Sequence, residues 1–218
     1  MEKLSYLEAV AAPIPADNLD TDQLMPKQFL RGIDKSGLDK GLLYNMRMNP
    51  DGTPNKDFVF NKPGFEDVKI IAAGPNFGCG SSREHAVWGL LQYGIRAVIA
   101  PGFGEIFYSN CFNNGLLAAK VTPEASLEIL EALSADEPRR LAIDAAACTI
   151  ACMDGPAKGR TWTFEIGRRH QTMILEGLDM LESTLRDMPE IDAFKRRHEA
   201  AFPWMAELPG RMKALRGR

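Results

Sequence analysis

The sequence predicts an α/β fold built of packed layers, and three observations support this. Residues 68–73, 97–100 and 116–121 are short apolar runs bounded by turn formers, as expected for buried strands. Segments with helical periodicity lie between and after these runs, which favours crossover connections and a mainly parallel sheet. The chain has 218 residues, of which 45% are hydrophobic and 25% are charged. This is the composition of an ordinary globular protein that needs no disulfide or metal for stability.

The N-terminal quarter is expected to form one strand followed by irregular chain. Residues 7–14 have strand character, whereas 17–22 contain too many turn formers for a regular element. Weak helical periodicity covers 27–48. Pro- and Gly-containing turns in 49–63 predict an exposed segment, so the whole of 27–63 is expected to leave the main domain as an excursion.

Helices are predicted before and after the second buried strand, at 82–93 and 105–113. A further helix at 123–133 has the clearest start. There Thr122 suits the N-cap, a proline occupies the first helical position and a glutamate lies in the first turn.

The C-terminal part is expected to contain antiparallel strands and then helices. We expect residues 1–187 to form the main domain and 188–218 a helical extension, whose basic end from residue 210 is frayed. The short strands are predicted at 141–143, 148–152 and 161–166.

Charge and cysteine content exclude several function classes. The net charge of -3 argues against a general nucleic-acid binder, which needs a basic surface. No apolar run reaches the ~18 residues of a membrane span, and acidic residues interrupt any signal-peptide core. We therefore expect a soluble cytoplasmic protein. The cysteines form no CxxC pair, which is against a disulfide framework or a zinc site: Cys79, Cys111, Cys148 and Cys152.

A glycine-rich loop at 74–80 is the most informative stretch. It links a buried strand to a helix, the position at which layered α/β folds bind ligands. Gly78 and Gly80 permit positive φ and leave backbone N–H groups uncovered. The loop matches neither of the two common nucleotide-binding patterns, since it lacks their lysine and their third glycine.

The helix after this loop has features of an anion site. Ser81 and Glu84 have the spacing of a capping box, so Ser81 is expected to begin the helix. The exposed N–H groups and the positive end of the helix dipole would then favour a carboxylate or phosphate, and Arg83 adds a guanidinium fork. The alternative is that Ser81 only caps a helix.

Several motifs together resemble one known family. They are residues 76–86 (Asn-Phe-Gly-Cys-Gly-Ser-Ser-Arg-Glu-His-Ala), 106–110 (Ile-Phe-Tyr-Ser-Asn), 114–117 (Asn-Gly-Leu-Leu) and the Asp-rich 17–23. The chain closely resembles the small subunits of 3-isopropylmalate dehydratase over roughly residues 4 to 187. That resemblance implies a three-layer swivelling β/β/α domain of the aconitase superfamily type.

The resemblance also implies roles for residues 81–85 (Ser-Ser-Arg-Glu-His), called the serine block below. Ser81 would be the catalytic base, whose alkoxide takes a proton from the substrate carbon next to a carboxylate. Ser82 and Arg83 would bind a substrate carboxylate. A helix N-terminus and a guanidinium both favour the alkoxide, so the local chemistry agrees with these roles.

Other residues are implied as substrate-binding or supporting groups. Asp22 would help to orient histidines of a second subunit, although a turn-forming role is the alternative. Arg31 corresponds to a second carboxylate-binding arginine. Gly80, Glu84 and His85 would support the active site.

By the same resemblance, the segment 27–43 would set substrate choice. Its Phe29 and Leu30 could face an isopropyl group. An apolar lining would favour isopropylmalate, whereas an additional cationic side chain would favour a tricarboxylate.

The chemistry of dehydration implies a partner. Removal of hydroxide needs a Lewis acid, and the cysteines lack the spacing that iron–sulfur ligation requires. No cofactor is therefore expected in this chain, and a [4Fe-4S] cluster is expected on a large subunit. The large subunit would contact the glycine-rich loop and parts of 17–60.

The leading hypothesis is the small subunit of a hydro-lyase that interconverts 2- and 3-isopropylmalate in leucine biosynthesis, acting as a heterodimer. One alternative is the same chemistry on another diacid, such as 2-methylmalate/citraconate or homoaconitate. Two others are a non-catalytic module that keeps this fold and a free-standing phosphate binder.

Overall fold

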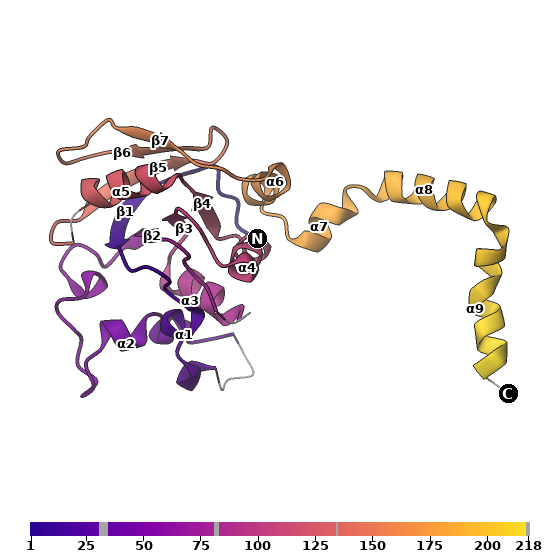
Figure 1. The fold of residues 1–218 in the computed structure, drawn as a ribbon, viewed down its shortest axis with the longest axis horizontal. Coiled ribbons are helices and arrows are strands. Elements are labelled where there is room, and N and C mark those ends of the chain that lie inside the picture. Colours follow the sequence, from indigo (N-terminus) through magenta and orange to yellow (C-terminus); the bar gives the residue numbers. More distant parts are fainter. Residues whose placement is uncertain (31–34, 81–82, 134, 217–218) are drawn as a thin grey trace. The chain divides into compact units, whose positions relative to one another are not determined.

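A computed structural model describes residues 1–30, 35–80, 83–133 and 135–216, and Figure 1 shows its fold. The predicted residues Arg31, Ser81 and Ser82 lie outside these ranges. Contacts within the chain divide it into two compact units, Met1–Asp179 and Met180–Arg218. The two units are described separately.

The described part of the first unit contains a seven-stranded mixed sheet in the order β4-β3-β2-β1-β5-β6-β7. Strands β1 to β4 pair in parallel. Strands β5 to β7 continue the sheet in antiparallel fashion from β1. The strands are β1 (Tyr6–Ile14), β2 (Val68–Ala73), β3 (Ala97–Ala100), β4 (Leu117–Lys120), β5 (Arg139–Asp144), β6 (Thr149–Cys152) and β7 (Thr161–Thr163).

Helices cover the sheet on both sides. In Figure 1, α1, α2 and α3 lie on one side of the parallel strands, and α5 lies on the other side together with the curled antiparallel strands. The helices of this unit are α1 (Thr21–Leu24), α2 (Tyr44–Arg47), α3 (His85–Tyr93), α4 (Glu105–Asn114), α5 (Pro123–Ala132) and α6 (Arg168–Glu176), with 3₁₀ turns η1 (Lys27–Phe29), η2 (Leu38–Gly41) and η3 (Val59–Asn61).

The parallel strands form the centre of the core. All four residues of β3 are buried, because helices cover both of its faces. The apolar runs thus predicted the strands correctly, and the layered α/β class and the swivelling-domain fold are confirmed. Helix α5 also starts as predicted, since the Thr122 hydroxyl accepts a hydrogen bond from the Ala125 N–H at 3.2 Å.

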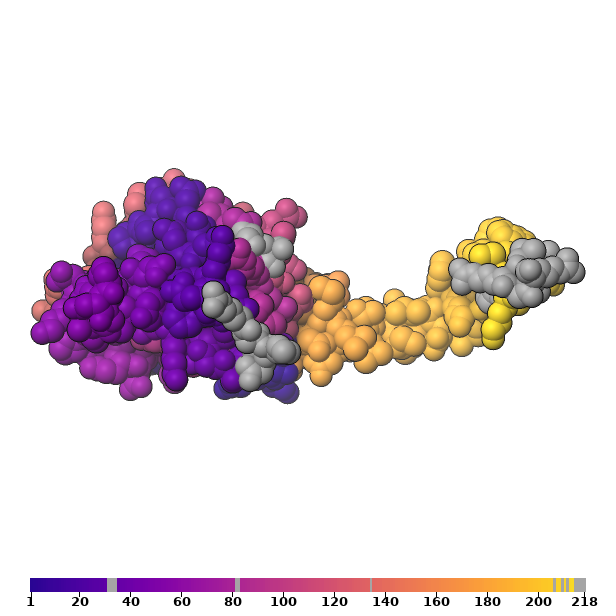
Figure 2. All heavy atoms as spheres, turned by 90° about the horizontal axis from the view of Figure 1, so that it is seen from below, coloured from indigo at the N-terminus to yellow at the C-terminus, as the bar shows by residue number. Residues whose placement is uncertain are grey.

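Two predictions about the N-terminal segment are wrong. The Asp-rich stretch contains helix α1, because Asp20 and Gln23 form a capping box: the Gln23 N–H donates to Asp20 Oδ1 at 2.7 Å and the Asp20 N–H to Gln23 Oε1 at 2.9 Å. The excursion is not exposed throughout. Val59 and Phe60 are buried, and the Phe60 ring stacks on Tyr93 at 5.2 Å. In Figure 2 the purple atoms of the excursion occupy much of the face drawn.

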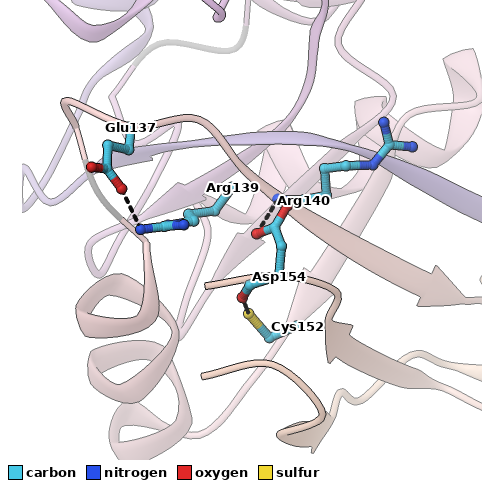
Figure 3. Close-up of polar contacts among 5 residues, drawn as sticks. All are labelled: Glu137, Arg139, Arg140, Cys152 and Asp154. Atoms are coloured by element: carbon cyan, nitrogen blue, oxygen red, sulfur yellow. Dashed lines mark hydrogen bonds and ion pairs between the residues drawn. The ribbon is translucent and has the colours of Figure 1, made fainter. Parts of the chain in front are cut away.

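The antiparallel end of the sheet is closed by local polar contacts, drawn in Figure 3. The backbone N–H of Arg140 donates to both carboxylate oxygens of Asp154, at 3.1 and 3.2 Å. The Cys152 thiol donates to the backbone oxygen of Asp154 at 3.2 Å, and Arg139 pairs with Glu137. These contacts hold the β6–β7 connection near the first residues of β5.

The second unit consists of α7 (Met180–Leu185), α8 (Met188–Ala201) and α9 (Pro203–Arg216). No residue of α7 or α8 is buried. Helix α9 continues to Arg216. Across the described residues, every helix is too short or too polar to cross a membrane.

Candidate active site

The glycine-rich loop lies beside the segment that enters α1. Both segments follow parallel strands, β2 and β1, and so emerge at the same edge of the sheet. The side chains also meet, since Asn76 Nδ2 donates to Asn18 Oδ1 at 2.8 Å. Three backbone hydrogen bonds join the segments: Asn18 N–H to Pro75 O (2.9 Å), Gly78 N–H to Leu19 O (2.7 Å) and Thr21 N–H to Cys79 O (3.0 Å).

Gly78 and Gly80, two of the three glycines in this loop, occupy positions where the structure favours glycine. Gly78 has φ +71° and lies against the Phe107 ring, where a Cβ atom would overlap ring carbons. Gly80 has φ +90° and approaches Asp20, with 3.5 Å between a built Cβ and the Asp20 Cβ. The left-handed backbone and the close approach together let the loop pass between α4 and α1.

The Arg83 guanidinium forms an ion pair with Asp22. The Arg83 side chain is 26% exposed and that of Asp22 is 46% exposed, so both can be reached from solvent. Lys27 lies nearby, with its Nζ 4.0 Å from Asp22 Oδ2. Two cations, Arg83 and Lys27, therefore lie around the Asp22 carboxylate, and Arg83 follows the glycine-rich loop by three residues.

Helix α3 begins at His85, with Glu84 as the N-cap. The helix was predicted to start at residue 82, whereas the described part of it starts at His85; Ser81, the predicted cap, lies outside the described residues. The Glu84 and His85 side chains make contacts with other residues. Glu84 Oε1 accepts a hydrogen bond from Asn114 Nδ2 at 2.6 Å, and His85 packs against the Trp88 ring at 4.8 Å.

The predicted site residues that the structure describes are gathered around one loop. Asp22 contacts Arg83, and Gly80, Glu84 and His85 flank it along the chain. Three further candidates, Ser81, Ser82 and Arg31, lie outside the described residues.

Sequence reasoning missed the part that Asn114 and Lys27 play near this loop. Asn114 occurred only within a family motif, and no local pattern indicated that its amide would reach Glu84. Lys27 lay in the segment assigned to substrate choice, with no indication of its distance from Asp22.

The cysteines do not form a metal site in the described part of the chain. No group of three His, Cys, Asp or Glu side chains there could hold a metal ion. Cys79 donates its thiol hydrogen to the Asn18 carbonyl at 3.4 Å. Cys111 is fully buried, and burial raises the pKa of its thiol well above the usual range.

A mostly apolar groove of ≈ 480 Å³ opens at the same edge of the sheet. It is bounded by the ends of β1, β2 and β3 and by the first turns of α5. Its lining residues include Pro15, Gly74, Pro75, Pro101, Ser126 and Leu127.

Comparison with known proteins identifies the relatives. Residues 1–124 match the family described as the aconitase C-terminal domain. The chain is 52% identical to 3-isopropylmalate dehydratase small subunit 1 of Chromobacterium violaceum over 95% of each chain. It is 45% identical to the 3-isopropylmalate dehydratase small subunit of Agrobacterium fabrum, over 94% of this chain and all of that one.

A solved structure agrees with these relatives. The crystal structure of 3-isopropylmalate dehydratase (leuD) from Methanocaldococcus jannaschii superposes with a TM-score of 0.63 at 27% sequence identity. The match covers 87% of this chain and 99% of that chain.

Proposed function

The chain belongs to the family of 3-isopropylmalate dehydratase small subunits, and we propose that it interconverts 2- and 3-isopropylmalate together with a large subunit. The observation that carries the proposal is the 52% identity to one such small subunit along 95% of the chain. The reaction is a dehydration followed by rehydration, as part of leucine biosynthesis. No observation favours the other diacids.

In this proposal Ser81 is the base. As an alkoxide it accepts a proton from the substrate carbon next to a carboxylate, and the hydroxide leaves the neighbouring carbon to give an unsaturated diacid. The serine then returns the proton to the other carbon as water adds. A serine is too weak a base without help, so nearby positive charge is needed to stabilise its anion.

Arg83 is proposed to bind a substrate carboxylate, with Ser82 beside it and Arg31 as a second cation. The guanidinium has five N–H donors, and its pairing with Asp22 occupies only part of them. Asp22 fixes the direction of the guanidinium, and the remaining donors can form the two-point contact that carboxylates favour.

The Lewis acid is proposed to come from the partner. The described cysteines and acids of this chain do not fit a cluster, because no three of them converge. A [4Fe-4S] cluster on the large subunit would supply the positive centre that assists departure of the hydroxyl group. We also infer a cytoplasmic location, since the four cysteines are free thiols.

Substrate choice is proposed to depend on the segment 27–43. Phe29 packs on Tyr44 with ring centroids 5.0 Å apart, and Leu30 is half-buried. This gives the described part of the segment an apolar side, which suits an isopropyl group better than a third carboxylate.

The test is reconstitution with the large subunit of the same organism. The pair is assayed with 2-isopropylmalate, 2-methylmalate and homocitrate by the absorbance of the unsaturated product. We expect turnover of 2-isopropylmalate, and a loss of at least ~10³-fold in kcat for Ser81→Ala, as for other removed catalytic groups. Ser5→Ala, at an exposed serine of the same chain, is the matched control.

Two results would contradict the proposal. Preference for another diacid would refute the substrate, and full turnover by Ser81→Ala in an intact complex would refute the base.

A further inference from the structure

We propose that Asn114 is a positioning residue for this reaction: its amide holds the first turn of α3 and, through Trp88, residues 35–38 of the segment 27–43 that is proposed to set substrate choice. The inference rests on the proposed function, because it concerns the same site. Asn114 lies at the end of α4, far from the serine block in sequence, and no substrate contact is assigned to it.

Both polar atoms of the Asn114 side-chain amide form hydrogen bonds. Its Nδ2 donates to Glu84 Oε1 at 2.6 Å and to the Asn110 carbonyl at 2.9 Å. Its Oδ1 accepts from the indole Nε1–H of Trp88 at 2.9 Å. A carboxylate only accepts and an indole only donates, so the orientation of the amide is determined by its partners. All three contacts are partly buried.

The partners of Asn114 bracket the first turn of α3. Glu84 is the N-cap of that helix and follows Arg83 directly, and Trp88 lies one turn further along. Two hydrogen bonds to one side chain therefore fix both the position of this turn along the helix axis and its rotation about that axis. Arg83, which pairs with Asp22, directly precedes this turn.

Trp88 carries the effect to the segment 35–38. Lys35 Nζ lies 4.0 Å from the centre of the indole ring, a cation–π distance. Gln92, one turn further along α3, donates to the Lys35 carbonyl and accepts from the Leu38 N–H at 2.9 Å. Helix α3 thus holds residues 35–38, which belong to the segment proposed to set substrate choice.

These contacts connect the first turn of α3 with residues 35–38, and both belong to the part of the proposed active site that this chain contributes. A displacement of about 1 Å in a reacting group can reduce turnover ~10²-fold even when no contact to substrate is lost. Loss of the Asn114 amide is expected to lower kcat through Glu84 and to change KM through Trp88 and Lys35.

A first experiment needs neither the partner nor activity. The chain has three tryptophans, so its ¹H–¹⁵N spectrum has few indole N–H signals, and Trp88→Phe identifies one of them. Asn114→Ala is expected to shift that signal and to leave the signals of Trp162 and Trp204 in place. Asn113→Ala, at a neighbouring residue of the same type on the same helix, should shift none. An unmoved Trp88 signal in a folded Asn114→Ala protein would overturn the proposal.

A second experiment exchanges the donor and the acceptor of the Asn114–Glu84 hydrogen bond and measures kcat of the assembled enzyme. Asn114→Asp still accepts from Trp88 but sets a second carboxylate against Glu84, and a kcat decrease of roughly 10- to 100-fold is expected. Adding Glu84→Gln returns a donor opposite the new acceptor and should recover at least ~10-fold of that loss. Asn113→Asp adds the same charge next door and serves as the control.

The activity test uses whichever diacid the wild-type pair turns over, so a wrong substrate assignment would not hide the result. Rescue in the double variant supports a specific contact. Equal losses in Asn113→Asp and Asn114→Asp, or no recovery in a folded and assembled double variant, would refute it.

Discussion

The two halves of the sheet differ in what their connections do. In the parallel half, β1, β2 and β3 end at one edge, and the segments that follow β1 and β2 carry Asp22, Gly80 and Arg83. In the antiparallel half, β5 to β7 are joined by connections that contain no proposed site residue. Crossover connections bring distant segments together at one edge, whereas hairpins join only neighbouring chain. The described residues of the proposed site therefore follow strands of the parallel half, and the antiparallel half contributes to the core.

The largest expected effect comes from adding a methyl group to a glycine in each half. Gly78 and Gly155 have nearly the same φ, +71° and +68°, so alanine brings a similar backbone strain at both. At Gly78 the new Cβ overlaps the buried Phe107 ring, whereas at Gly155 it meets the movable side chain of Arg139, with 2.8 Å to Nε. Gly78→Ala should cost roughly 1–3 kcal/mol more in the free energy of unfolding than Gly155→Ala.

Urea denaturation of both variants and of the wild type measures that difference. Gly78→Ala should also lower the activity of the assembled enzyme, because the displaced loop leads into the serine block. Equal destabilisation by the two alanines would mean that the loop is not held between α4 and α1 as described.

The second comparison concerns two half-exposed arginine ion pairs. Arg83 pairs with Asp22 beside the proposed site, and Arg160 pairs with Glu128 at 2.8 Å next to β7. Exposed pairs contribute only ~0–1 kcal/mol to stability, so Arg→Lys should change the unfolding free energy little at either position. Lysine cannot make a two-point contact, so Arg83→Lys should reduce kcat/KM by roughly 10- to 100-fold.

Steady-state kinetics of the two lysine variants make the measurement. Arg160→Lys is expected to retain wild-type kcat/KM. A similar loss in both variants would show that replacing a guanidinium by an ammonium group lowers turnover wherever it is done on this unit, and would remove the proposed role of Arg83.

Local sequence patterns predicted the strands but not the contacts between segments. The run in β3 is apolar throughout and that in β2 is apolar except for the exposed Lys69, because helices cover the sheet on both sides, and that pattern needs no knowledge of neighbours. The spacing of Ser81 and Glu84 gave no indication that the Glu84 carboxylate accepts a hydrogen bond from Asn114, which is 30 residues away. The ring contact of Phe60 also involves a distant partner, Tyr93. Spacing rules describe only near neighbours, so they cannot anticipate either contact.

A third prediction tests whether the antiparallel half affects stability alone. The Trp162 indole N–H donates to Glu128 Oε2 at 2.8 Å, and the residue is 6% exposed. Trp162→Phe removes this bond while keeping an aromatic ring, so about 0.5–1.5 kcal/mol of unfolding free energy should be lost. Because β7 carries no site residue, kcat and KM should stay within twofold of wild type.

Thermal and urea unfolding, together with kinetics of the assembled enzyme, check this. A marked decrease in kcat at temperatures where the variant is folded would show that the two halves are coupled.

The smallest effect is expected where the two halves meet, at His170. The imidazole on α6 stacks on the Phe112 ring of α4, with centroids 4.2 Å apart and planes 3° from parallel. Burial, and to a lesser extent the charge of Arg169, lowers the pKa of His170 below its usual value. The unfolded chain therefore binds the proton more readily than the folded one.

Since the folded pKa is lowered, the neutral ring contributes fully above the ordinary histidine pKa of about 6.5, and stability falls as the pH drops below it towards the folded pKa. The wild type should lose more unfolding free energy than His170→Gln between pH 7 and pH 5.5, with the difference vanishing above pH 7. Urea titrations of both proteins at several pH values measure this. Parallel pH curves for the wild type and His170→Gln would mean that the ring is as well solvated in the folded protein as in the unfolded chain, and that the α4–α6 contact does not bury it.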